Sequence, residues 1–283
     1  MAIRVLIVSN KGGPGKTTVA TTAAEAAARH GYTSLVVDLD HQGNATRRLG
    51  LDRNHLLASG HAGIADVLDP DNPVPVADAV VSCGWDVPNA SRIRVLPSIA
   101  DLPLQRRTRE HGEPGAIFRL RNALDAYDRD VHLTFIDVHP GTDHLLENAV
   151  LATDVIYLVV DLETIDGVDG GRTVAAYVLS YAPKLGRTDL GIAGVIVNKY
   201  NGDSAVQRGL LADLPAYFLF ERGGEPYQIP VLPDPIPHLT TASNAQHRGV
   251  PIVTETHPVV KARLNQVIDN MIKHILSNTY AKP

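Results

Sequence analysis

The chain has 283 residues, of which 44% are hydrophobic and 20% charged, a composition that excludes collagen-like, low-complexity and disordered proteins. Its 26 basic and 31 acidic residues give a formal net charge of −5, which excludes a globally basic nucleic-acid-binding surface but leaves room for a local basic patch. The single cysteine, Cys83, excludes a disulfide within the chain and a metal or iron–sulfur site built from several cysteines of one subunit. The sequence shows no secretory signal and no apolar run of about 18 residues, so we expect a cytoplasmic protein.

Short apolar runs rich in valine and isoleucine alternate with helical patterns along the chain. Continuous hydrophobicity is typical of parallel strands that are covered on both faces. We expect strands at residues 3–8, 34–39, 93–96, 133–138, 155–160, 192–197 and 229–232, and helices at residues 16–30, 116–126, 144–152, 168–181, 204–218 and 259–276. This alternation predicts an α/β fold with a mostly parallel, doubly wound central sheet flanked by helices.

Residues 51–91 do not follow this alternation. They contain four prolines and three glycines, with a short helical pattern near residues 64–68. We interpret them as an irregular insertion within one domain that spans residues 1–283, because a few short elements are too little for a second core.

A glycine-rich loop follows the first predicted strand directly and precedes an alanine-rich helix. It reads Asn10-Lys11-Gly12-Gly13-Pro14-Gly15-Lys16-Thr17-Thr18. Glycines let backbone N–H groups surround an anion, and the helix N-terminus adds positive potential. Lys16 is placed to reach the β- and γ-phosphates of ATP, and the Thr17 hydroxyl to hold Mg²⁺. The sequence therefore predicts a P-loop NTPase, although Asn10 replaces the first glycine of the usual G-x-x-x-x-G-K-[ST] pattern.

The run Lys-Gly-Gly-x-Gly-Lys-Thr-Thr resembles the deviant Walker A loop of the ParA/MinD family of ATPases. In that family the early lysine, here Lys11, reaches the partner's phosphates across a nucleotide-sandwich dimer. The resemblance implies an ATP-linked homodimer, with Lys11 and Lys16 as catalytic residues. It implies that the nucleotide is bound by Lys11, Gly12, Gly13, Pro14, Gly15, Lys16, Thr17 and Thr18.

The second predicted strand runs into Asp38-Leu39-Asp40-His41-Gln42-Gly43-Asn44-Ala45-Thr46. Carboxylates at the end of a parallel strand lie at the ligand crevice of such a sheet. This segment resembles the first switch of the family, usually Asp-x-Asp-Pro-Gln-Gly-Asn, and the run Gln-Gly-Asn-Ala-Thr points to its ParA branch. The resemblance implies that Asp40 orients the attacking water and contributes to the metal site, and that Asp38 shapes the metal's surroundings. A solvated turn that caps a helix is the alternative interpretation.

The strand at 133–138 ends in Phe-Ile-Asp137-Val-His139-Pro-Gly. It resembles a Walker B element, which implies that Asp137 holds Mg²⁺ through water. His41 and His139 stand where relatives usually have proline. Either they are ordinary turn residues or they make turnover depend on pH, since unperturbed histidine titrates near pH ~6.5.

Two later strand ends resemble the adenine pocket of the family. The resemblance implies that Asn198 and Pro233 enclose the base and that Asp234 accepts a hydrogen bond from its amino group. Relatives commonly have Pro-Arg where this chain has Pro-Asp. Ordinary turns at strand ends are the alternative.

Members of the family differ in what their ATP-bound dimer binds, and the sequence argues for or against each of these classes. Cys83 alone cannot supply an iron-protein cluster, and Tyr280 alone is no autokinase tyrosine cluster. A membrane-binding MinD-like protein needs an amphipathic C-terminal helix, and residues 259–276 carry such an apolar stripe. A terminal helix that packs on its own sheet has the same pattern, and this helix carries no bulky aromatic anchor. We therefore favour packing on the sheet and keep a MinD-like membrane-associated ATPase as an alternative.

A ParA-like partition protein binds DNA through lysine and arginine contacts to phosphates. Candidates in the second half of the chain are Lys184, Arg187, Lys199, Arg208, Arg222, Arg248, Lys261, Arg263 and Lys273; scattered surface charges are the alternative for each. Because the loop begins near residue 11, we expect the short form without an N-terminal DNA-binding domain. The resemblance implies a nucleoid-associated ATPase with slow basal turnover, which binds DNA non-specifically and is released by a ParB-like adaptor. Its cargo is plasmid or chromosomal DNA or, alternatively, a protein.

Overall fold

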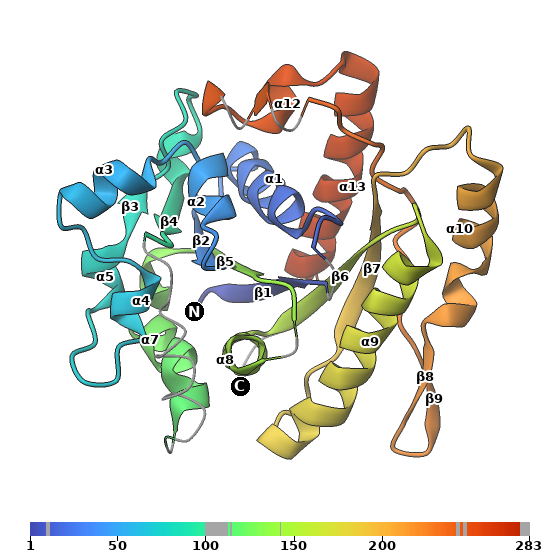
Figure 1. Cartoon of the computed structure of the whole chain (residues 1–283), viewed down its shortest axis with the longest axis horizontal. Helices are drawn as coiled ribbons and strands as arrows, with labels where there is room; N and C mark the ends of the chain where they lie inside the picture. The colour runs from blue at the N-terminus through green and yellow to red at the C-terminus, as the bar shows by residue number, and fades with distance from the viewer. Residues whose placement is uncertain are drawn as a thin grey trace.

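A seven-stranded sheet with the strand order β3-β4-β2-β5-β1-β6-β7 forms the centre of the molecule (Figure 1). The computed structural model describes residues 1–9, 12–99, 113, 115–141, 143–241, 244–245 and 248–277. The strands are β1 (Ile3–Val8), β2 (Ser34–Leu39), β3 (Val81–Ser82), β4 (Ile93–Leu96), β5 (Leu133–Val138), β6 (Val155–Asp161) and β7 (Ile192–Asn198). Neighbouring strands are parallel except β3 and β4. The predicted mostly parallel sheet is confirmed.

Helices cover both faces of this sheet. They are α1 (Lys16–Arg29), α2 (Asn44–Arg48), α3 (Arg53–Ala58), α4 (Ile64–Val67), α5 (Val76–Ala79), α7 (Arg119–Tyr127), α8 (His144–Ala152), α9 (Ile165–Tyr181), α10 (Ala205–Tyr217), α12 (Ile252–Glu255) and α13 (Pro258–Ser277), with short 3₁₀ turns η1 (Ala90–Arg92), η2 (Ala116–Phe118), η3 (Asp128–Asp130) and η4 (Ala182–Leu185). Successive β1 residues alternate between two cores: Leu6 packs with α8 and α9, and Val5 with α1 and α13. The sheet is therefore doubly wound, as predicted, with α1 and α13 on one side and α8 and α9 on the other (Figure 1).

The apolar stripe of α13 lies inside the second of these cores. Leu264, Ile268 and Ile275 are almost completely buried and share a cluster with the alanines of α1. The stripe that could have faced lipid is thus covered by the chain's own core. In the described residues no helix is long and apolar enough to cross a membrane.

Residues 51–91 are joined to the sheet by its edge strand. Within them, β3 pairs antiparallel with β4, and the short helix predicted near 64–68 is α4. The side chains of Cys83 and Trp85 are buried against the core that contains α1. The irregular segment therefore packs on the same core as the sheet.

Two segments differ from the predicted elements. Residues 229–232 form no strand but one isolated parallel bridge, Val195 to Val231, because Pro230 and Pro233 have no N–H to donate to a ladder. The predicted helix at 116–126 is divided into the 3₁₀ turn η2 and the helix α7.

The sequence interpretation missed a β-hairpin beyond the β7 edge. Strands β8 (Leu219–Arg222) and β9 (Glu225–Gln228) pair antiparallel around Gly223 and Gly224, which both have positive φ. A two-residue hairpin turn requires this backbone, and a Gly-Gly pair is a recognised signal for it. The hairpin extends away from the sheet beside α9 and α10 (Figure 1).

Candidate nucleotide-binding site

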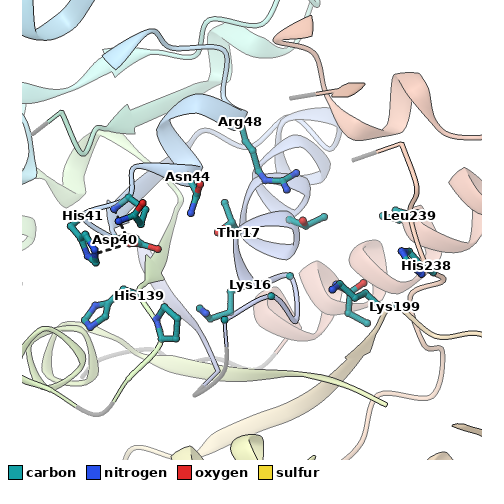
Figure 2. A pocket seen from close by; sticks show the side chains of 17 residues that line it. Lys16, Thr17, Asp40, His41, Asn44, Arg48, His139, Lys199, His238 and Leu239 are labelled. Atoms are coloured by element: carbon teal, nitrogen blue, oxygen red, sulfur yellow. Dashed lines mark hydrogen bonds and ion pairs between the residues drawn. The ribbon is translucent and has the colours of Figure 1, made fainter. Parts of the chain in front are cut away.

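A polar cavity of about 640 Å³ opens where β1, β2, β5 and β7 end (Figure 2). It is lined by Gly12, Gly13, Gly15, Lys16, Thr17, Thr18, Asp40, His41, Gln42, Asn44, Arg48, His139, Pro140, Asn198, Lys199, His238 and Leu239. Ligands of open α/β sheets bind at this edge, at the carboxyl ends of the strands. The structure thus brings the glycine loop, the segments that follow β2 and β5, and Asn198 to one cavity.

The glycine loop places the N-terminus of α1 at the cavity. Gly15 precedes the helix with φ 100°, and no described side chain caps the first turn. A Cβ at Gly15 would lie 2.0 Å from Nδ2 of Asn198, which donates a hydrogen bond of 2.6 Å to the carbonyl of Pro14. The close packing needs glycine, and the uncapped N–H groups suit a phosphate.

Thr17 and Asp137 form a pair at the base of the cavity. The Thr17 hydroxyl donates to Oδ2 of Asp137 at 2.7 Å, while the buried Oδ1 of Asp137 has no hydrogen-bond partner in the described part of the chain. Burial, together with the charge of Asp38, raises the pKa of Asp137 to about 7. The Oδ1 atom of Asp137 accepts no hydrogen bond among the described residues and lies beside the Thr17 hydroxyl oxygen. Two oxygen ligands of this kind suit a hard cation such as Mg²⁺.

The two carboxylates of the first switch have different surroundings. Asp38 is fully buried, and its Oδ2 accepts hydrogen bonds from the backbone N–H and the hydroxyl of Thr46, at 2.7 and 2.6 Å. Burial raises the pKa of Asp38 to about 6. Asp40 lines the cavity and accepts a 2.9 Å bond from the Gln42 N–H. Asp38 therefore holds the switch segment in place, and Asp40 is the carboxylate that a ligand can meet.

The lysine that ends the loop is buried at the cavity. Lys16 is 6% exposed, and burial lowers the pKa of its ammonium group, while the carboxylates of Asp137 and Asp40 act in the opposite direction. Such a cation is ready for an anionic ligand. Lys11, the other predicted catalytic lysine, lies outside the described residues.

The two histidines that depart from the family pattern meet at one side of the cavity. The rings of His41 and His139 lie edge to face, with centroids 6.1 Å apart. His139 also contacts Oδ2 of Asp143 through Nε2 at 2.9 Å, and His41 lies 3.6 Å from Oδ1 of Asp40. The sequence placed one histidine after each of the strands β2 and β5 but gave no sign that their rings meet.

The predicted adenine residues are separated in the structure. Asn198 lines the cavity, whereas Pro233 and Asp234 line a second cavity of about 260 Å³ against α13, where Asp234 accepts a 3.2 Å bond from Gln266. The structure therefore does not bring Pro233 and Asp234 to the nucleotide cavity, contrary to our prediction.

The reason is that the chain after residue 230 runs alongside β7 before it reaches the end of that strand. The backbone N–H of Leu232 bonds to Val195, and that of Ile236 to Val197, at 2.9 and 2.8 Å. As a result, His238 and Leu239 reach the cavity. A second proline followed by a polar residue, Pro237-His238, was the signal that could have indicated this.

Two cations at the cavity were missed as site residues. Among the described residues, Lys199 is the one non-glycine residue with positive φ. Backbone in this region is costly and often marks functional sites. The side chain of Lys199 lies close to the loop: a Cβ built on Gly13 would be 4.0 Å from Nζ of Lys199. Arg48 reaches the cavity from α2.

Comparison with known proteins agrees with this geometry. A model of the CobQ/CobB/MinD/ParA nucleotide-binding domain matches residues 5–252. The chain is 30% identical to the chromosome partitioning protein ParA of Caulobacter vibrioides over 227 residues, 76% of this chain and 77% of that protein. It is 26% identical to the cell division protein PomZ of Myxococcus xanthus over 277 residues, 97% of this chain and 79% of that one.

The fold also matches a solved structure with a bound nucleotide. Cobyrinic acid a,c-diamide synthase of Mycobacterium smegmatis, with ADP and magnesium, superposes with a TM-score of 0.76 at 23% identity, over 98% of this chain and 96% of that one. That likeness concerns the fold alone. With the family model covering most of its length and a ParA protein 30% identical, the chain belongs to the CobQ/CobB/MinD/ParA family and, within it, to the ParA-type partition ATPases with a deviant Walker A loop.

Proposed function

We propose that this protein is an ATPase that segregates plasmid or chromosomal DNA. It closes into a homodimer around ATP, binds DNA without sequence preference in that state, and leaves DNA when an adaptor of the ParB type stimulates hydrolysis. The observation that best supports ATP binding and hydrolysis is the Thr17–Asp137 pair, which lies beside the buried Lys16 at the N-terminus of α1. No described side chain caps that N-terminus. The kinship with a chromosome partitioning ParA protein supports the DNA cargo.

Within this proposal the loop residues 11–18 bind the phosphates of ATP. Mg²⁺, held by Thr17, Asp137 and Asp40, shields the negative charge of the β- and γ-phosphates. Lys16 contacts the same phosphates, and Asp40 orients the attacking water. Asn198 holds the loop at the carbonyl of Pro14 and borders the base. Basal turnover is slow because the adaptor supplies the stimulating group.

The ATP-bound dimer depends on Lys11 in this proposal, since the resemblance assigns it to the partner's phosphates. Two protomers that neutralise each other's nucleotide are held together only while the γ-phosphate is present. Hydrolysis therefore couples directly to dissociation, and dissociation to release of DNA.

We place the proposed DNA contact on the outer face of α13. Several of the predicted basic residues already have partners: Arg187 pairs with Asp189, and Arg248 with Glu255. Arg263 and Lys273, by contrast, are exposed on α13 and form no hydrogen bond or ion pair among the described residues. They lie on the side of the helix opposite its buried stripe, where DNA phosphates can reach them.

A second candidate function is the positioning of a protein cargo by the same ATP cycle. The match to the cell division protein PomZ favours it, because that match extends over 97% of this chain, against 76% for the ParA protein. Loss of a low-copy plasmid or of chromosome copies after deletion of the gene supports DNA cargo. Normal DNA inheritance with a displaced protein structure supports the second candidate.

The test of the proposed function is binding to random-sequence duplex DNA, measured with ATP, with ADP and without nucleotide. We expect binding with ATP only, loss of binding in Lys11→Ala, and weakening with salt because phosphate contacts release counterions. Absence of binding at low salt with ATP contradicts the DNA-binding role, and binding to liposomes or to a protein surface is then measured next.

A further inference from the structure

Arg48 is a cation in the nucleotide cavity without an acceptor among the described residues. It is the last residue of α2, its side chain is half-buried, and it lines the cavity, where Figure 2 draws it above Thr17. The guanidinium forms no hydrogen bond or ion pair with any residue that the structure describes. Burial lowers its pKa, with the charge of Asp137 acting in the opposite direction. A half-buried guanidinium in this state is unfavourable unless an anion joins it.

No carboxylate among the described residues forms an ion pair with the Arg48 guanidinium. Asp38 and Asp40 accept hydrogen bonds from Thr46 and from the backbone of Gln42, and Asp137, whose Oδ1 has no described hydrogen-bond partner, acts on Arg48 only through its charge. The described part of the chain therefore supplies no anion that pairs with Arg48, and a ligand in the cavity can. A planar guanidinium matches the oxygens of a phosphate with two parallel hydrogen bonds, which a lysine cannot form.

The irregular segment 51–91 holds Arg48 in place. The indole Nε1 of Trp85 donates to the carbonyl of Arg48 at 2.7 Å, and the N–H of Gly84 donates to the carbonyl of Leu49 at 2.8 Å. The two chain segments approach so closely that a Cβ at Gly84 would lie 2.3 Å from the Gly50 carbonyl oxygen. The C-terminal end of α2 is thus fixed at the cavity by the segment that contains Trp85.

The position of Arg48 indicates which phosphate it meets. In Figure 2 His41, Asp40 and His139 are drawn at one side of the cavity, Lys199 and His238 at the other, and Arg48 above Thr17 between the two sides. In the proposed function the attacking water, and with it the γ-phosphate, lies beside Asp40. Because Arg48 extends from the end of α2 and not from the side of Asp40, we assign it to a phosphate that ADP and ATP share.

We propose that Arg48 is a nucleotide ligand of this site, which binds a phosphate group common to ADP and ATP through its guanidinium, with Trp85 as its positioning residue. This inference rests on the proposed function in one respect only, namely that the cavity binds ATP. It assigns to residues 51–91 a role in building the nucleotide site.

Calorimetric titration with Mg²⁺–ADP and with a non-hydrolysable Mg²⁺–ATP analogue tests it. We expect Arg48→Ala to weaken both nucleotides on the order of tenfold to a hundredfold, as loss of a charged hydrogen bond does, and Arg48→Lys to retain part of the affinity. Arg47→Ala is the matched control, because Arg47 lies on the same helix, bonds to Asn44 and does not line the cavity. Thermal melting checks that each variant is folded.

A double-substitution measurement tests the role of Trp85. Trp85→Phe removes the indole donor while keeping the buried ring, and we expect it to weaken both nucleotides by a smaller factor than Arg48→Ala. In the Arg48→Ala background it should have no further effect on nucleotide affinity. An equal loss in both backgrounds overturns the positioning role, because the effect is then general destabilisation.

The remaining outcomes separate this inference from the proposed function. If Lys16→Ala abolishes binding but Arg48→Ala binds both nucleotides within twofold of the parent, Arg48 is no ligand. If Arg48→Ala weakens only the ATP analogue, the assignment to a shared phosphate is overturned. If the parent protein binds neither nucleotide, the proposed function itself is overturned, and the role of Arg48 with it.

Discussion

The hydroxyl of Thr17 donates to one carboxylate oxygen of Asp137 at 2.7 Å, while the other oxygen of Asp137 is buried without a hydrogen-bond partner among the described residues. Thr17 lies in the first turn of α1, and Asp137 near the end of the strand next to β1. This pair joins the first turn of α1 to the end of β5. It is the part of the cavity that a divalent cation can complete, because both side chains offer oxygen ligands.

Removal of the Thr17 hydroxyl should weaken Mg²⁺-dependent nucleotide binding. We expect Thr17→Ala to lose on the order of tenfold or more in affinity for ADP with Mg²⁺, and much less with a chelator present. Thr17→Ser keeps the hydroxyl and is the control. Calorimetry with and without Mg²⁺ measures both, and equal losses under the two conditions would argue against a metal at this pair.

The raised pKa of Asp137 also predicts how the free energy of unfolding depends on pH. Its pKa is raised from 3.8 to about 7 in the folded protein, so the folded state binds more protons than the unfolded state between these values. The free energy of unfolding contributed by this group is therefore fully present at pH below about 4 and is lost as pH rises through 7. Asp38, with a pKa of about 6, acts in the same direction.

The measurement is the melting temperature of the nucleotide-free protein from pH 5 to pH 8, for the parent and for Asp137→Asn. We expect the difference in melting temperature, variant minus parent, to grow by several degrees towards pH 8, because the amide carries no buried charge. If the melting temperatures of the parent and of Asp137→Asn change with pH in the same way, this prediction is wrong. Mg²⁺ with ADP should stabilise the parent most at the higher pH.

The phosphate loop contains two glycines with opposite tolerance for a side chain. Gly15 has φ 100°, and a Cβ there would collide with Asn198, whereas a Cβ at Gly12 would meet no atom of the described residues within 4 Å. We expect Gly15→Ala to lower the free energy of unfolding by about 1–3 kcal/mol. Gly12→Ala should change it by no more than about 0.5 kcal/mol. Urea denaturation measures both, and equal effects would contradict the described loop geometry.

The outer face of α13 supplies a test of DNA binding. We expect Arg263→Ala together with Lys273→Ala to weaken ATP-dependent DNA binding without changing nucleotide affinity. For each DNA phosphate that the variant no longer neutralises, the slope of log K against log salt should become shallower by about 0.9. Arg187→Gln, at a residue already paired with Asp189, serves as the comparison. An unchanged salt slope in the α13 variant would place the DNA surface elsewhere.

The sequence predicted those parts of the molecule that local pattern determines. The strands that became β1, β2, β4 and β5 have the predicted bounds because each is a short, mostly apolar run that is followed by a polar or turn residue. The glycine loop and the carboxylate at Asp137 were found for a similar reason, since phosphate and metal chemistry requires these residue types directly after a strand.

What the sequence did not predict depends on contacts between distant segments. Pro233 was placed in the base pocket because it follows an apolar run, but pairing of that run with β7 moves the cavity residues on to His238. That Arg48 and Thr17 line one cavity, and that the rings of His41 and His139 meet, follows only when α2 and β5 pack beside the loop. No local pattern encodes these distances.

In the proposed function, ATP switches this protein between a monomer and a dimer. Sedimentation velocity of the parent and of Lys11→Ala, each with ATP and with ADP, tests it most directly, and Asp40→Ala provides a variant that should stay in the ATP state. We predict a dimer for the parent and Asp40→Ala with ATP only, and a monomer for Lys11→Ala with either nucleotide. A parent that stays monomeric with ATP, or a Lys11→Ala protein that dimerises as the parent does, would contradict the account.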